Sequence, residues 1–188
     1  MVNGASKITS TYEVTGVLEE VAADSAALAL GKHLSEINAC RDCHGASFEG
    51  RVFADAPPFL MVAPNLTSGE GGVGGRYGVE DWDRAIRYGV RPDGTSLLIM
   101  PARTFHNLTD TDAASLIAYL QSLPPVDNVL PPREIRPLGR VLLGSGAMDV
   151  AMEVHTSPDR APAHHPVRRL NTATTSVPSP VSIAIRTI

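Results

Sequence analysis

The sequence has few of the residues on which several classes of protein depend. It contains two cysteines in 188 residues, close together, so no framework of structural disulfides is available. Aromatic residues make up 5% of the chain, and the net charge of −4 gives no sign of a nucleic-acid-binding surface. No apolar run approaches the roughly 18 residues of a transmembrane helix. We therefore expect no nucleic-acid partner and no membrane span within this sequence.

The two cysteines belong to a C-x-x-C-H motif at residues 40–44, the pattern at which c-type haem is attached covalently. Cys40 and Cys43 lie on neighbouring positions of one helical turn. Their thiols can therefore reach both vinyl groups at one edge of a haem and form thioethers. His44 is then held beside the iron as a ligand. A dithiol redox pair and half of a zinc site are the alternatives. The sequence has no third cysteine for zinc and no βαβ pattern around a redox pair.

Three segments combine an apolar side with residues that favour the start or end of a helix: 26–37, 80–88 and 113–123. Asp24 or Ser25 can cap the first of them. Gly31 inside this helix costs about 1 kcal/mol relative to alanine, which indicates that another helix crosses it closely. The sequence T-D-T-D at 109–112 resembles a capping box for the third helix, which is the natural partner for the first.

The region between the motif and the second helix shows no helical pattern. Pro57-Pro58 interrupts regular structure, and the apolar run at 59–62 could line a haem. The glycine-rich stretch at 69–75 formally contains G-x-G-x-x-G, but no strand precedes it, which excludes a dinucleotide-binding turn. We expect this stretch to be a mobile surface loop.

A haem that only carries electrons needs a second axial ligand opposite His44. Met100 is the preferred candidate, because Pro101 disfavours helical backbone there and presents the side chain from a loop. The pairing of histidine with methionine is usual in cytochromes c. Met61 is the main rival, with a role in an apolar pocket wall as its alternative.

Taken in order, the motifs resemble those of one family. They comprise C-x-x-C-H at 40–44, A-P-N-L-T at 63–67, E-D-W-x-R-A-I-R-x-G-V at 80–90, R-P-D-G at 91–94, M-P at 100–101 and L-I-A-Y-L-Q-S-L-P-P-V-D-N at 116–128. This combination resembles a class I c-type cytochrome domain. It is most similar to the membrane-anchored mono- and dihaem cytochromes that accompany bacterial alcohol and gluconate dehydrogenases. The resemblance covers about residues 24–145.

The resemblance implies an all-α, small class I cytochrome c fold, with three to five helices around one covalently bound haem. The first and last core helices should cross at Gly31 and Tyr119. The expected organisation is a lead-in, a cytochrome domain, a proline-rich extension with a short helix near 144–154, and a disordered tail, at residues 1–23, 24–128, 129–160 and 161–188 respectively.

The resemblance also implies the site. Haem c would be held by thioethers at Cys40 and Cys43, and its iron by His44 and Met100. The carbonyl of Pro64 should accept the ring N–H of His44, a bond that fixes the tautomer of the ligand. Two further side chains are expected near the haem propionates: Trp82 and Arg103.

The function implied is one-electron transfer, with redox proteins as partners: a dehydrogenase or quinol-side donor and a respiratory acceptor. No nucleophile, base or substrate pocket is evident, so we expect no substrate turnover by this chain. One alternative is a haem enzyme with an open or labile sixth position that handles peroxide or another small ligand. Another is a truncated, non-functional fragment.

Haem is attached to such motifs outside the cytoplasm, which implies the periplasm or the outer face of the cytoplasmic membrane. Residues 1–11 lack the basic and then apolar plan of a signal peptide. We therefore expect an N-terminal anchor in the full-length protein, and membrane association through it.

Relatives of this kind often continue into a second haem domain. Codons for residues 170–188 can be chosen so that the adjacent reading frame encodes the start of such a domain, which predicts that residues 161–188 are a frameshifted sequence. Reading the gene decides this prediction. It fails if the adjacent frame over these residues does not encode such a start.

Overall fold

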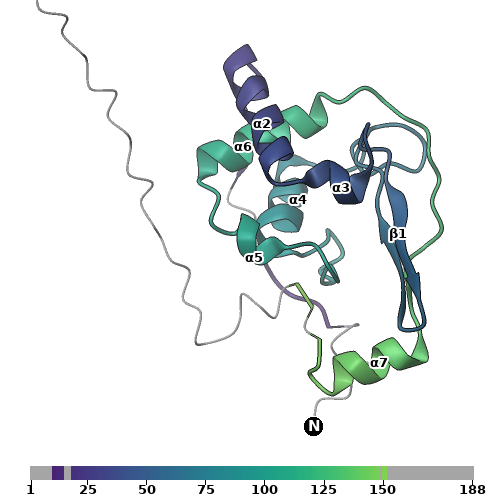
Figure 1. Cartoon of the computed structure of the whole chain (residues 1–188). Helices are drawn as coiled ribbons and strands as arrows, with labels where there is room; N and C mark the ends of the chain where they lie inside the picture. The colour runs from purple at the N-terminus through teal and green to yellow at the C-terminus, as the bar shows by residue number, and fades with distance from the viewer. Residues whose placement is uncertain (1–9, 15–17, 149, 152–188) are drawn as a thin grey trace, which may run out of the picture.

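The computed structural model describes residues 10–14, 18–148 and 150–151 (Figure 1). The described elements, in chain order, are α2 (Ser25–Ile37), α3 (Cys40–His44), β1 (Arg51–Ala56), β2 (Phe59–Ala63), α4 (Val79–Asp83), the π-helix η1 (Arg84–Tyr88), α5 (Ala102–Phe105), α6 (Asp110–Gln121), β3 (Glu134–Ile135) and α7 (Pro137–Gly144). Among the described residues of the predicted lead-in, Thr11 forms an isolated β-bridge with Thr95. The predicted tail at 161–188 lies outside the described residues.

The capped helices confirm the helical predictions. The Asp24 side chain accepts hydrogen bonds from the backbone N–H groups of Ala26 and Ala27, at 2.9 and 2.8 Å, and so caps α2. The Thr109 hydroxyl accepts from the N–H of Asp112 at 3.1 Å and caps α6. The second predicted helix forms as α4 and η1 in direct succession.

Helices α2 and α6 cross at one end of the molecule (Figure 1). A Cβ atom on Gly31 would lie 2.0 Å from the carbonyl oxygen of Ser115 and 2.7 Å from Cβ of Tyr119. The crossing therefore occurs at Gly31 and Tyr119, as the resemblance implied. Glycine is needed at this position because the two backbones touch there.

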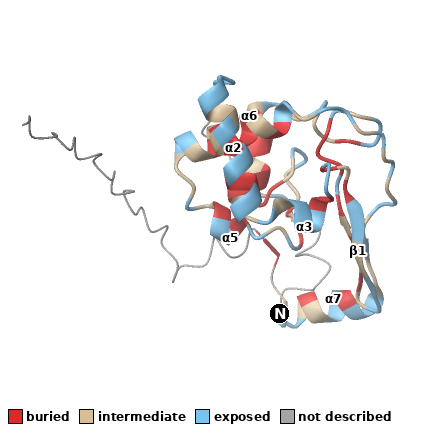
Figure 2. Ribbon diagram, turned by 45° about the horizontal axis from the view of Figure 1, so that its top comes forward, coloured by how far each residue is buried: buried red, intermediate tan, exposed pale blue. Residues whose placement is uncertain are grey.

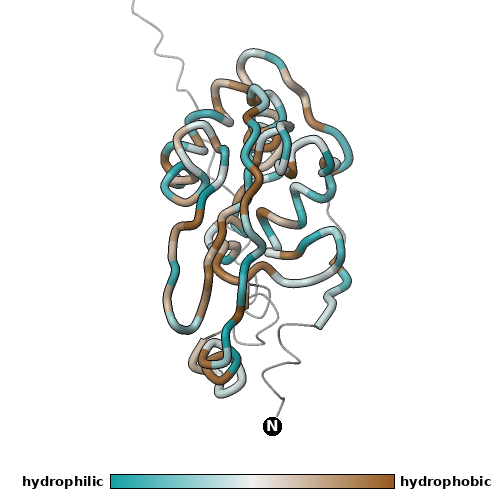
Figure 3. Tube along the Cα trace, turned by 90° about the vertical axis from the view of Figure 1, so that its right-hand side faces the viewer, coloured by the Kyte–Doolittle hydropathy of each residue, from teal (hydrophilic) through white to brown (hydrophobic). Residues whose placement is uncertain are grey.

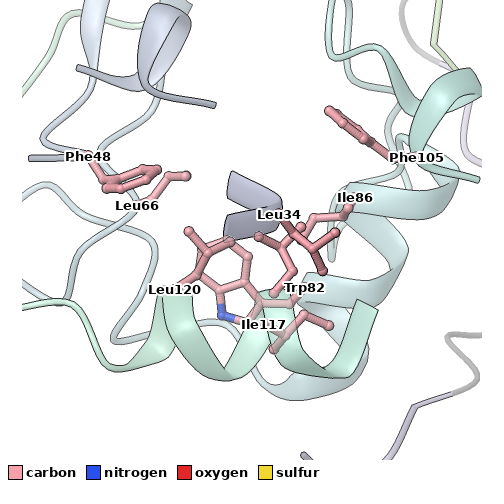
Figure 4. Close-up of a cluster of buried hydrophobic side chains, with 9 residues drawn as sticks. Leu34, Phe48, Leu66, Trp82, Ile86, Phe105, Ile117 and Leu120 are labelled. Carbon is pink, nitrogen blue, oxygen red and sulfur yellow. The ribbon is translucent and has the colours of Figure 1, made fainter. Parts of the chain in front are cut away.

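The main hydrophobic core lies beneath this crossing. Figure 2 shows the buried residues concentrated along α2, α6 and α5. Figure 4 shows Trp82 beside Ile117 and Leu120 of α6. The full cluster of buried side chains is Leu34, Phe48, Leu66, Trp82, Ile86, Phe105, Leu116, Ile117 and Leu120.

The all-α prediction is wrong, because the described residues include a three-stranded antiparallel sheet in the order β1-β2-β3. β1 and β2 form a hairpin whose turn is Pro57-Pro58, with Ala56 opposite Phe59 and Arg51 opposite Ala63. Prolines lack an N–H donor but are tolerated in turns. The two prolines that seemed to break regular structure therefore connect two strands.

The chain beyond residue 128 packs back onto this hairpin. β3 pairs with β2, and α7 lies against the turn, where a Cβ on Gly139 would meet the carbonyl oxygen of Pro58 at 2.3 Å. The helix predicted near 144–154 begins where α7 ends, at Gly144; residues 145–148 are not helical, and residues 149 and 152–154 lie outside the described residues. Figure 3 shows apolar and polar residues mixed along α7, at the end of the molecule opposite α2 and α6. A second buried cluster forms here from Phe59, Met61, Leu98, Leu143 and Val150.

The glycine-rich stretch at 69–75 is packed rather than free of the rest of the chain. A Cβ on Gly69 would lie 2.2 Å from the carbonyl oxygen of Val126, and one on Gly72 would lie 2.0 Å from that of Thr67. The N–H of Asn128 donates to the carbonyl of Glu70 at 2.9 Å. The stretch is a surface loop, as expected, with Glu70 and Gly75 exposed, but its glycines allow close backbone contacts with the rest of the chain.

Within the described ranges, no helix is long and apolar enough to cross a membrane.

The close crossing predicts that Gly31→Ala destabilises the protein. Overpacking of this kind costs about 1–3 kcal/mol, which exceeds the gain of roughly 1 kcal/mol in helix propensity. The matched control is Gly75→Ala, since a Cβ there meets nothing closer than 3.6 Å. Urea denaturation should show a lower free energy of unfolding for Gly31→Ala only. Equal stability of the two variants would contradict the contact.

Candidate haem-binding site

The C-x-x-C-H motif forms the short helix α3, which is bounded by two residues with positive φ angles. Ala39, before it, has a φ of 54°, and Gly45, after it, has a φ of 86°. Such a conformation is uncommon for a residue with a Cβ and persists where the surrounding structure imposes it. The turn at Ala39 follows the end of α2 directly, so α3 is tied closely to the helix that crosses α6.

His44 is buried, and its ring is oriented by the backbone. Nδ1 of His44 lies 2.9 Å from the carbonyl oxygen of Pro64. A carbonyl can only accept, so Nδ1 carries the proton and the lone pair of a neutral ring is on Nε2. Burial lowers the pKa of His44, although the bond to Pro64 opposes this. The ring is therefore neutral near pH 7, the form in which histidine binds a metal.

The Pro64 carbonyl is held in place by its neighbour Asn65, which is fully buried. The Asn65 side-chain oxygen accepts from the N–H and the hydroxyl of Thr67 at 2.9 and 2.8 Å. Its Nδ2 donates to the carbonyl of Val126 at 2.7 Å. Asn65 of the A-P-N-L-T motif thus fixes the carbonyl that accepts the His44 hydrogen bond. No local sequence pattern predicted this role of Asn65.

The thiols differ in exposure. Cys43 is exposed and Cys40 is partly buried. Burial raises the pKa of the Cys40 thiol to about 11, with a further contribution from Cys43. Dithiol redox catalysts work with a lowered thiol pKa that favours the nucleophilic thiolate. The raised pKa of Cys40 is therefore the opposite of what the dithiol alternative requires.

A cavity of about 430 Å³ opens beside α3. Its volume lies within the roughly 300–1,000 Å³ typical of cofactor pockets. Its walls come from both halves of the chain and include some of the core side chains labelled in Figure 4: Leu66, Trp82, Ile86, Phe105 and Leu120. Six of the seven predicted site residues line it: Cys40, Cys43, His44, Pro64, Trp82 and Met100.

Arg103 is the predicted site residue that does not line the cavity. It lies exposed on α5. Met61 also lines the cavity, but it packs into the second buried cluster with Phe59 and Leu98. Met100 also lines the cavity, is partly buried and packs against the main core.

Three arginines that the sequence did not single out line the cavity: Arg76, Arg91 and Arg133. Arg91 follows η1 and Arg133 precedes β3. Burial lowers the pKa of Arg91. Burial lowers that of Arg133 to about 10, with a smaller effect from the positive charge of Arg91. Local sequence patterns did not reveal Arg133, because it reaches the cavity only through the pairing of β3 with β2.

The residues present fit a haem. Trp82 is 2% exposed, and its Nε1 has no hydrogen-bond partner among the described residues. A buried indole N–H usually has a partner, and Trp82 lines the cavity. The neutral ring of His44 matches the iron, and the two adjacent thiols match the two vinyl groups. The apolar walls match the macrocycle, and the cationic side chains match the two propionates.

A pocket of this kind beside a C-x-x-C-H helix defines a protein that binds haem c covalently. The family model of cytochrome c matches residues 28–124, just over half of the chain, and the chain belongs to this family.

Several curated relatives are cytochrome subunits of dehydrogenases. The cytochrome c subunit of the quinone alcohol dehydrogenase of Gluconacetobacter polyoxogenes is 31% identical over 110 residues, which are 56% of this chain and 24% of the relative. The fructose dehydrogenase cytochrome subunit of Gluconobacter japonicus is 30% identical over 112 residues, 56% of this chain and 23% of the relative. A dihaem c-type cytochrome of Cereibacter sphaeroides is 27% identical over 157 residues, 77% of this chain and 53% of the relative. The chain thus spans about a quarter of the dehydrogenase subunits that it matches.

The bonds of Asn65 predict that Asn65→Ala destabilises the protein. Leaving buried hydrogen-bonding groups unpaired costs about 1–3 kcal/mol. Asn107→Ala is the control, because Asn107 is exposed and makes one long bond, of 3.4 Å, to the carbonyl of Arg103. Chemical denaturation should show the loss for Asn65→Ala alone. A loss no greater than in the control would contradict this role of Asn65.

Proposed function

We propose that this chain is a one-electron carrier that holds a single haem c, and that it is not itself an enzyme. Bound haem supplies a ferrous–ferric couple. The observation that carries the proposal is the His44–Pro64 bond beside a cavity that both thiols line. Cys40 and Cys43 act in attachment of the haem, and His44 and Met100 in ligation of its iron. The apolar side chains of the cavity exclude water.

The thiols of Cys40 and Cys43 hold the cofactor through thioethers. Each thiol would add its S–H across one vinyl double bond of a bound haem, with sulfur and hydrogen going to the two vinyl carbons. The reaction needs no oxidant. Cys40 and Cys43 lie three positions apart on α3, so one short helix presents both sulfurs.

His44 and Met100 are the proposed iron ligands. The Nδ1–H of His44 donates a hydrogen bond to the carbonyl of Pro64, which leaves the lone pair of Nε2 for the metal. Met100 precedes Pro101, which stands before α5 and holds the methionine in a loop. A thioether ligand favours the ferrous state and raises the potential above that of a bis-histidine site. With both ligands retained in both oxidation states, little rearrangement accompanies each electron.

The exposed Cys43 supports an exchange surface at the thioether edge. Exposed apolar side chains also stand at the mouth of the cavity, including Ile99 and Val129. By analogy with the relatives, the donor is a dehydrogenase or a quinol-side protein, and the acceptor is a respiratory protein. Covalent haem attachment supports a location in the periplasm or at the outer face of the cytoplasmic membrane.

The proposal predicts different spectra for two methionine variants of the haem-loaded protein. Met100→Ala should remove the methionine-to-iron absorption band near the red end of the spectrum. Met61→Ala should keep the band, since Met61 is assigned to the apolar wall. Loss of the band in Met61→Ala alone would reassign the ligand. A wild-type spectrum without the band would favour an open sixth position and small-ligand chemistry.

A further inference from the structure

Two guanidinium groups meet at one end of the cavity without a carboxylate beside them. Arg91 donates to the carbonyl of Ser96 at 2.8 Å and to the hydroxyl of Thr95 at 3.2 Å. Arg133 donates to the same Ser96 carbonyl at 3.4 Å. One backbone oxygen therefore holds two cations together.

The charges of this pair are not balanced nearby. Within the described part of the chain, no carboxylate lies within 4.0 Å of either guanidinium. Asp93 acts on both from a longer distance and raises the pKa of each, against the lowering effect of burial. Holding two half-buried like charges at an apolar cavity is unfavourable unless an anion compensates them.

The second arginine comes from outside the matched family region. The cytochrome c model ends at residue 124, whereas Arg133 lies beyond it, next to β3. The pairing of Phe59 with Ile135 and Leu60 with Glu134 fixes this segment against the hairpin. Residues 129–131 line the same cavity on the way to Arg133. The segment after the matched domain thus forms part of the cavity wall.

We propose that Arg91 and Arg133 form a carboxylate-binding site for the propionates of the cofactor, and that residues 129–135 thereby complete the site and tune its potential. This inference rests on the proposed haem function. Guanidinium groups bind carboxylates strongly because they offer paired donors in a planar fork. A cation near the iron also disfavours the ferric state, which carries the extra positive charge. Arg133 is a positioning residue in this account, because it acts on the iron through the propionates.

The test uses the full chain loaded with haem and compares Arg133→Gln with Arg140→Gln. Arg140 is exposed on α7, does not line the cavity, and loses the same charge. In Arg133→Gln, the ferrous-to-ferric ratio at a fixed ambient potential should fall at least about threefold, which is about 28 mV at 59 mV per tenfold change. The haem-propionate bending bands in the resonance Raman spectrum should shift as well. The control should leave both readouts near those of the wild type.

Arg133→Lys is the second variant, in case the glutamine variant folds poorly. Lysine keeps the positive charge but lacks the paired N–H donors of the guanidinium group. The ferrous-to-ferric ratio should therefore stay near the wild-type value, while the Raman bands shift. Equal responses of Arg133→Gln and Arg140→Gln would overturn the inference, as would unchanged Raman bands in every variant. Absence of covalent haem from the wild-type protein would overturn the proposed function itself, and the inference with it. The two failures are distinguished by the mass of the wild-type protein.

Discussion

The hydrogen bond between His44 and the carbonyl of Pro64 joins two segments that are twenty residues apart. Contacts from several other elements position either the histidine or the proline. At the histidine end, α3 is fixed by the turn at Ala39 and by α2, which touches α6 at Gly31. At the proline end, Asn65 anchors the backbone to Val126, beyond the end of α6. The same α6 therefore supports both ends, so loosening it would move donor and acceptor apart.

The proposed electron transfer depends on this rigidity. A ligand that keeps its place in both oxidation states limits the rearrangement that accompanies each electron. The packed glycine-rich stretch contributes to it, because Gly69 lets the backbone approach Val126, to which Asn65 is bonded. The buried Arg87–Asp83 pair, at 2.5 Å, and the 2.6 Å contact of Arg87 with Asp110 likewise tie η1 to the start of α6. These are structural contributions to the site by residues that do not line the cavity.

The predictable parts of the fold were those with local signals. Asp24 and Thr109 are caps, and caps act within a few residues. The hairpin was missed because Pro57-Pro58 was interpreted as an interruption rather than a turn. β3 and α7 were missed because their positions depend on partners more than seventy residues earlier in the chain.

The site residues likewise divide into those that local motifs revealed and those that depend on distant parts of the chain. The motif and the family resemblance led to Cys40, Cys43 and His44, and to Pro64, Trp82 and Met100, all of which line the cavity. Arg103 was expected near the propionates from the family resemblance, but it is exposed on α5 and does not line the cavity. Arg133 could not be found from local patterns, because strand pairing alone brings it to the cavity.

The central claim is that one haem is attached to Cys40 and Cys43 and bound by His44. The most direct test is the intact mass and absorption spectrum of the full chain, secreted behind a leader peptide in a bacterium that attaches haem c. The account predicts a mass increased by one haem, a low-spin spectrum, and loss of both in a Cys40→Ser, Cys43→Ser double variant. An unmodified mass, in cells that load a control cytochrome, would contradict it.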